Sequence, residues 1–180
     1  MRIRRIVVRL DAAPRNRAVR EAATVLADKM GAELVGLFVE NVDLLHFAGF
    51  PFACEVCFSS ATRRALDVER MERSLRALAD EARRTLGAIV GRTSVRWSFR
   101  VARGTVSREL LAAAGDAGLV IALEGAVDEA EHPASVRVVR AGDARALSAV
   151  LAEKAQGVLV VVGTDDARIG ETLRALAEGA

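Results

Sequence analysis

Leu34-Val35-Gly36-Leu37-Phe38-Val39 is an unbroken apolar run within residues 32–39, and it is the stretch that decides the fold. A strand that is apolar at every position is buried on both faces, which is typical of a parallel sheet covered by helices on both sides. Similar runs occur at Ile6–Val8, Leu119–Leu123 and Val158–Val162. We therefore predict an α/β fold with an open, mostly parallel sheet and helices on both faces.

Amphipathic segments separate these apolar runs. The first, which Asn16 can cap, has apolar residues at helical spacing and ends at Gly31, a residue suited to a left-handed helix stop. These apolar positions are Val19, Ala22, Ala23, Leu26 and Met30. Gly104-Thr105 begins another helix, which runs through Leu110 to Ala114. This alternation of strands and helices predicts right-handed crossovers and a doubly wound sheet.

A long helix is predicted from Asp67 to Val90, because apolar residues recur there at three- and four-residue intervals. The apolar stripe consists of Val68, Met71, Leu75, Leu78, Ala82, Leu86 and Ile89. Opposite charges four residues apart mark the outer face, in the pairs Glu69/Arg73, Glu72/Arg76 and Asp80/Arg84. The stripe also fits a coiled coil, but packing against the sheet is the favoured interpretation.

Two further strands are assigned from shorter patterns. Residues 94–102 alternate between apolar and polar, which predicts a strand near an edge of the sheet. Ser135–Arg140 also resembles a strand, but it follows Leu123 too closely for a helical crossover to a parallel neighbour. We therefore predict an edge ribbon or an antiparallel excursion there.

The end of the chain completes the predicted sheet. Asp143 can cap a helix, Gly157–Gly163 encloses an apolar strand, and Asp165 or Asp166 can cap the last helix. Five core strands, a possible edge strand and their helices then form a single domain over residues 1–180.

Composition excludes several classes of protein. Of the 180 residues, 52% are hydrophobic, so a packed core is expected, and a formal net charge of +2 does not indicate nucleic-acid binding. No run approaches the roughly 20 apolar residues that span a bilayer, and the N-terminus lacks a signal-peptide core. We expect a cytoplasmic protein without membrane insertion. With only two cysteines, no disulfide framework is expected.

Four segments in order resemble the universal stress protein family. They are Ile6–Asp11, Ala32–Val39, Arg100–Gly104 before its helix, and Asp116–Leu123. Together with residues 147–162, they cover most of residues 3–163. The resemblance implies an adenine-nucleotide alpha-hydrolase-like fold, a stress-associated role and a homodimer that pairs through the last strand, Val158–Val162.

ATP-binding members of that family carry a Gly-x2-Gly-x9-Gly loop followed by Ser or Thr after the fourth strand. Glycine is needed because backbone N–H groups reach phosphate only where no side chain intervenes. Here residues 123–132 contain one glycine, Gly125, and four carboxylates that would repel a triphosphate, Glu124, Asp128, Glu129 and Glu131. Residues 126–142 thus form an atypical connection in place of the phosphate loop. We expect no ATP binding and no cofactor.

The adenosine end of the family's pocket is better matched. By resemblance, Asp11 and Val39 stand at positions that contact the nucleoside, with Gly125 as a third candidate ligand-binding residue. The alternative is that Asp11 stabilises the turn into the first helix and Val39 belongs to the core. A nucleoside or nucleoside monophosphate is the remaining ligand hypothesis.

Residues 41–65 form an insert rich in aromatic side chains. Phe47, Phe50, Phe52 and Phe58 are four of the six phenylalanines in the chain. The insert follows the carboxyl end of a strand, where open α/β sheets bind ligands, so it is placed to cover that crevice. Exposed apolar surface costs free energy, and the insert is therefore expected to act as a lid or to contact a second subunit or another protein partner.

Cys54 and Cys57 have the spacing of a redox or metal-binding pair, and His46 lies upstream. With His132 the chain barely reaches four nitrogen and sulfur ligands, and no thioredoxin-type helix start is present. The favoured interpretation is that both cysteines are small apolar side chains in an aromatic cluster, without a metal. A metal or thiol redox protein is the weakest of the functional hypotheses.

No recognisable catalytic motif occurs in the sequence, neither a nucleophile elbow nor a Walker loop nor a dinucleotide fingerprint. We therefore expect a non-enzymatic regulatory or adaptor protein that acts through protein contacts. The alternative is a sensor in which a nucleoside enters the crevice at the carboxyl edge of the sheet and displaces the insert.

Overall fold

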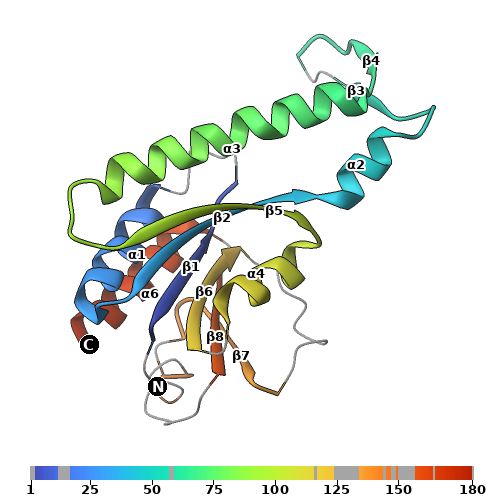
Figure 1. Ribbon diagram of the computed structural model, residues 1–180. Coiled ribbons are helices and arrows are strands. Elements are labelled where there is room, and N and C mark those ends of the chain that lie inside the picture. Colours follow the sequence, from blue (N-terminus) through green and yellow to red (C-terminus); the bar gives the residue numbers. More distant parts are fainter. Residues whose placement is uncertain are drawn as a thin grey trace.

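A six-stranded parallel sheet forms the centre of the computed structural model (Figure 1). The structure describes residues 3–11, 17–56, 59–115, 117–123, 134–143, 145–146, 149, 157–163 and 165–179. The strand order is β5-β2-β1-β6-β8-β7, and every neighbouring pair is parallel. The strands are β1 (Arg5–Arg9), β2 (Glu33–Asn41), β5 (Trp97–Gly104), β6 (Ala117–Leu123), β7 (Val136–Arg140) and β8 (Gly157–Gly163). The predicted fold class is confirmed.

Helices cover both faces of this sheet. They are α1 (Arg17–Met30), α2 (Val42–Ala48), α3 (Val68–Val90), α4 (Val106–Ala114) and α6 (Asp166–Gly179). α1, α3 and α6 lie on one face of the sheet, and α4 lies on the other (Figure 1). Ile6 and Val8 of β1 belong to the apolar cluster on the first face, whereas Val7 belongs to the cluster under α4. Successive side chains of a strand point to opposite faces, so a run apolar at every position supplies both clusters.

The predicted helix signals are confirmed wherever the structure describes them. α1 ends at Gly31, whose φ of +60° is a left-handed conformation that favours glycine. Asp67 caps α3 by accepting a hydrogen bond from the Glu69 backbone N–H at 3.1 Å. Asp165 caps α6 in the same way, accepting from the Arg168 N–H at 2.8 Å. Asn16 lies outside the described residues.

α3 packs against the sheet through its second half, as the favoured interpretation required. Its buried residues are Leu75, Ala79, Ala82, Leu86 and Val90. Arg73 and Arg76 form the predicted ion pairs with Glu69 and Glu72. The predicted Asp80/Arg84 pair is wrong, because Arg84 contacts the longer carboxylate of Glu81 at 2.7 Å.

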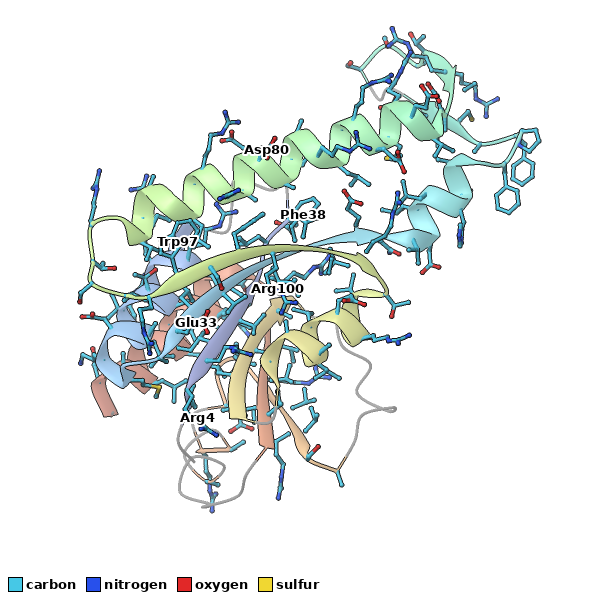
Figure 2. All side chains as sticks on the ribbon, viewed as in Figure 1. Arg4, Glu33, Phe38, Asp80, Trp97 and Arg100 are labelled. Atoms are coloured by element: carbon cyan, nitrogen blue, oxygen red, sulfur yellow. The ribbon has the colours of Figure 1, made fainter. Side chains whose placement is uncertain are left out.

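Charged residues fix the register between β2 and its neighbours. At the amino end of β2, Glu33 accepts hydrogen bonds from Arg5 of β1 at 3.3 Å and from Ser98 of β5 at 3.0 Å (Figure 2). At the carboxyl end, Glu40 forms an ion pair with Arg103 of β5 at 3.6 Å. A one-residue slip would turn these side chains to the other face, so the three contacts favour one alignment.

The expected antiparallel excursion is wrong, although β7 does lie at an edge. β7 pairs with β8 in parallel, and β8 separates it from β6. β6 and β7 both run parallel to β8, so they run in the same direction. Twelve residues, 124–135, separate them in the sequence, and about a dozen residues are enough for a parallel connection. After β7, Asp143 acts as the predicted helix cap, because its carboxylate accepts a hydrogen bond from the Ala146 N–H at 2.9 Å.

The position of β8 excludes the dimer contact that the resemblance implied. Val158–Val162 pair with β6 on one side and with β7 on the other. The backbone hydrogen-bonding groups of this strand are therefore used within the sheet. A second copy cannot add to it, so pairing through the last strand is wrong for this chain.

The insert at residues 41–65 is folded where the structure describes it. Asn41 caps α2 by accepting a hydrogen bond from the Asp43 N–H at 2.9 Å. A hairpin of β3 (Cys54–Val56) and β4 (Arg63–Ala65) follows, in which Glu55 lies opposite Arg64. α2 and the hairpin lie beside the first turns of α3 and project away from the sheet instead of covering its carboxyl edge (Figure 1).

Within the described part of the chain, no helix is both long enough and apolar enough to cross a membrane.

The close packing of α3 on β2 gives a first prediction. A Cβ atom at Gly36 would lie 2.5 Å from Leu86 Cδ2 and 2.8 Å from Leu10 Cδ1. We expect Gly36→Ala to lower the free energy of unfolding by about 1–3 kcal/mol, because both leucines are fully buried and must shift. Urea unfolding followed by circular dichroism measures this change.

Gly179→Ala is the matched control, because its new Cβ would meet no atom within 4 Å. It should leave the unfolding midpoint close to that of the wild type. Equal midpoints for both variants would show that α3 does not approach β2 as described.

Candidate functional site

The most distinctive surface is the end of the projecting insert. We call Leu44, Phe47, Phe50 and Phe52 the apolar tip. Their exposed fractions are 50%, 48%, 50% and 74%. Large apolar side chains gathered on one exposed segment mark an interaction site more often than singly scattered ones do.

The insert is attached through a different set of side chains. Leu45, Ala48 and Ala53 are buried, and Leu45 belongs to the same apolar cluster as Leu75 of α3. α2 is therefore apolar on its outer side as well as on the side that packs against the protein. Packing against the protein explains why the inner residues are apolar, but it does not explain why the exposed tip residues are apolar.

Backbone hydrogen bonds hold the tip in a defined shape. The N–H of Phe50 donates to the Phe47 carbonyl at 3.1 Å, and the N–H of Ala53 donates to the Phe50 carbonyl at 3.0 Å. The rings of Phe50 and Phe52 stack with their centres 5.3 Å apart and their planes 9° from parallel. The aromatic rings are thus presented by an ordered turn. Phe58, the fourth aromatic residue of the insert, lies outside the described residues.

Arg103 connects the two elements between which the insert lies, β2 and α3. This residue near the end of β5 forms ion pairs with Glu40 of β2 and with Glu72 of α3. Its hydrogen bond to Glu72 raises the pKa of the Arg103 guanidinium. Sequence patterns alone missed this group, because Arg103 and Glu40 become neighbours only once the β2–β5 register is known.

The nucleoside positions implied by the resemblance lie at the carboxyl edge of the sheet. Arg9 pairs with Leu37, and the N–H of Leu10 donates to the Leu37 carbonyl at 2.8 Å. Continuing this register places Asp11 level with Val39 on the adjacent strand. Val39 is half-buried against the cluster under α4, so it contributes to the core, and Asp11 is also half-buried. Gly125 and the four carboxylates of the phosphate-loop segment lie outside the described residues.

Two of the candidate metal or redox residues, Cys54 and His46, lie in the described part of the insert. Cys54 of β3 is an exposed free thiol, and His46 of α2 is also exposed. Cys57 and His132 lie outside the described residues. Among the residues that the structure describes, no three His, Cys, Asp or Glu side chains are grouped so as to hold a metal ion.

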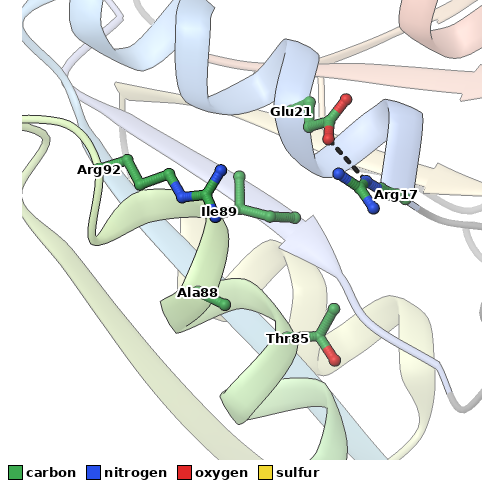
Figure 3. Close-up of a pocket in the computed structure, with 6 residues that line it drawn as sticks. All are labelled: Arg17, Glu21, Thr85, Ala88, Ile89 and Arg92. Atoms are coloured by element: carbon green, nitrogen blue, oxygen red, sulfur yellow. Dashed lines mark hydrogen bonds and ion pairs between the residues drawn. The ribbon is translucent and has the colours of Figure 1, made fainter.

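A separate recess lies between α1 and α3 (Figure 3). It has a volume of about 370 Å³ and is lined by Arg17, Glu21, Thr85, Ala88, Ile89 and Arg92. Arg17 donates to Glu21 at 2.7 Å, which raises the pKa of the Arg17 guanidinium. The lining side chains come from two helices far apart in the sequence, so no local pattern reveals the recess. None of its polar side chains is buried, and it does not resemble a formed ligand site.

These features define a parallel α/β protein with a projecting apolar surface. One solved structure to which the chain is similar is a universal stress protein in complex with cAMP. The match has 16% sequence identity and a TM-score of 0.46, and it covers 92% of this chain and 100% of that chain. No protein-family model matches the sequence. No curated protein matches it either.

The exposure of Cys54 gives a second prediction. We expect the native protein to react readily with a thiol reagent such as 5,5′-dithiobis(2-nitrobenzoate), and Cys57→Ser to retain one fast-reacting thiol per chain. The absorbance of the released thiolate measures the reaction. Cys54→Ser in the same background removes the only other cysteine and is the control. A Cys57→Ser protein that reacts only after denaturation would contradict the exposed position of Cys54.

Proposed function

We propose that this chain is a stress-associated regulatory or adaptor protein of the universal stress protein type, which acts through protein–protein contacts in the cytoplasm. It performs no catalysis and does not bind ATP. The resemblance of four sequence segments to that family supports the first part. The observation that carries the contact function is the exposure of Phe47, Phe50 and Phe52 on an ordered turn.

The energetics of the tip support a contact function. Each of these rings leaves roughly 100 Å² of apolar surface in water, because a phenylalanine buries about 150–250 Å² when fully enclosed. At about 25 cal/mol per Å², a partner that covers all three rings gains several kcal/mol. The fold of the chain obtains none of this gain, since the insert is anchored by Leu45, Ala48 and Ala53.

The proposal that ATP is not bound rests on the sequence of residues 123–132. One glycine cannot supply the several inward-turned amides that hold a triphosphate, and four carboxylates oppose its charge.

A small-ligand sensor is the second candidate function. The observation that favours it is the level placement of Asp11 and Val39 at the carboxyl edge, where open α/β sheets bind ligands. A nucleoside or nucleoside monophosphate is the ligand class.

Ligand titration gives a third prediction and separates the two functions. A ligand at 100 times its dissociation constant stabilises the folded state by about 2.7 kcal/mol, which raises the melting temperature by several degrees. We expect no such shift with millimolar ATP, AMP or adenosine, measured by thermal unfolding. A shift with adenosine or AMP that Asp11→Ala abolishes would favour the sensor, and a shift with ATP would refute the proposed loss of triphosphate binding.

Complementation gives a fourth prediction. In a stress-sensitive strain that lacks this gene, we expect the wild type and Asp11→Ala to restore survival. The triple variant Phe47→Ser/Phe50→Ser/Phe52→Ser should fail to restore it at equal protein level, because it lacks the contact surface. The opposite pattern, rescue by the triple variant and failure of Asp11→Ala, would reject the adaptor in favour of the sensor.

A further inference from the structure

We infer that the partner of the apolar tip is a second copy of this chain, packed tip to tip about a two-fold axis. This inference rests on the proposed function, in which the same tip is the contact surface, and it names the occupant. Two-fold dimers are the commonest oligomers, and each presents the same patch from both subunits.

The apolar area matches what a stable dimer needs. A standard interface buries about 800 Å² per partner, of which roughly 450 Å² is non-polar. The three rings supply about 350 Å² of this, from exposed fractions of 48–74% and about 200 Å² per phenylalanine. Leu44, Val56 of β3 and Val68 of α3 are each more than a third exposed and supply the remainder.

The charges around the tip favour a copy of the same chain over a strongly charged partner. Residues 42–73 carry five carboxylates and four guanidinium groups. The carboxylates belong to Asp43, Glu55, Asp67, Glu69 and Glu72, and the guanidinium groups to Arg63, Arg64, Arg70 and Arg73. A nearly neutral surface that carries both signs gives little net repulsion between copies, and it provides acidic and basic partners for the rim of a two-fold interface.

The sheet offers weaker routes to a dimer. β8 is internal, and both edge strands carry exposed arginines. These are Arg100 (labelled in Figure 2) and Arg103 on β5, and Arg137 and Arg140 on β7. Charged side chains on an edge strand oppose the addition of a further strand. The tip, in contrast, projects beyond the sheet, so two copies can meet there without contact between their sheets (Figure 1).

Sedimentation equilibrium of the full chain tests the inference. We expect the wild type to have twice the chain mass of 19.2 kDa. Phe47→Ser/Phe50→Ser/Phe52→Ser should weaken the dimer at least about 30-fold, the effect of losing a single hot-spot residue. Val25→Ser and Val101→Ser are matched controls, because these valines are 50% and 51% exposed on α1 and β5, away from the tip. Both should remain dimeric.

Energy transfer between labelled chains tests the geometry without altering the tip. A Cys57→Ser protein is labelled at Cys54 with donor or acceptor, and the two preparations are mixed. We expect efficient transfer, because a tip-to-tip dimer brings the two inserts together. A dimer that shows no transfer, or one that Val101→Ser dissociates, would place the interface on the sheet and overturn the inference.

A wild type that stays monomeric at millimolar concentration, or a dimer that survives the triple substitution, also overturns the inference. These failures are distinct from failure of the proposed function. If the wild type is monomeric and the triple variant still fails to protect against stress, the dimer is rejected and the contact function stands with a different partner. If the wild type forms a dimer that depends on the tip but the triple variant protects normally, the dimer stands and the contact function is rejected.

Discussion

The close approach of α3 to β2 at Gly36 is the constraint on which the rest of the architecture depends. Only a residue without a side chain lets Leu86 reach the strand backbone beside Leu10 and Phe99. This contact anchors the second half of α3 on the sheet. A 23-residue helix is about 35 Å long, and its buried residues begin only at Leu75. The first turns of α3 therefore extend beyond the sheet and support the insert.

A helix cap lies at each end of the insert. Asn41, the last residue of β2, caps α2, and Asp67, which follows the hairpin, caps α3. Arg103 joins the end of β2 to the overhanging part of α3 through Glu40 and Glu72. The buried contacts of Leu45, Ala48 and Ala53 hold the insert against the protein, and the two helix caps and the Arg103 guanidinium add to them. α2 leaves the carboxyl edge of the sheet uncovered (Figure 1).

Residues with local signals were predictable from the sequence, and residues placed by long-range pairing were not. β2 and β8 were predictable because burial on both faces demands apolar residues at every position. α3 was predictable because its apolar stripe and its Asp67 cap indicate the same helix. The direction of β7 was not predictable, because β7 pairs with β8, which comes later in the chain, and the spacing after Leu123 does not encode that pairing. Arg84 pairs with Glu81 and not with the predicted Asp80, because on a helix a carboxylate three residues away is as close to the guanidinium as one four residues away.

The candidate sites follow the same division. Asp11 and Val39 could be named only by resemblance, and the β1–β2 register is what sets them level. The aromatic content of the insert was visible in the sequence, but its exposure was not, because an apolar run predicts burial and cannot say against what. Leu45, Ala48 and Ala53 already attach the segment to the protein, so the exposed surface of the tip rings is not needed for that attachment. Their exposure costs solubility in the isolated chain, and a contact that covers them offsets that cost.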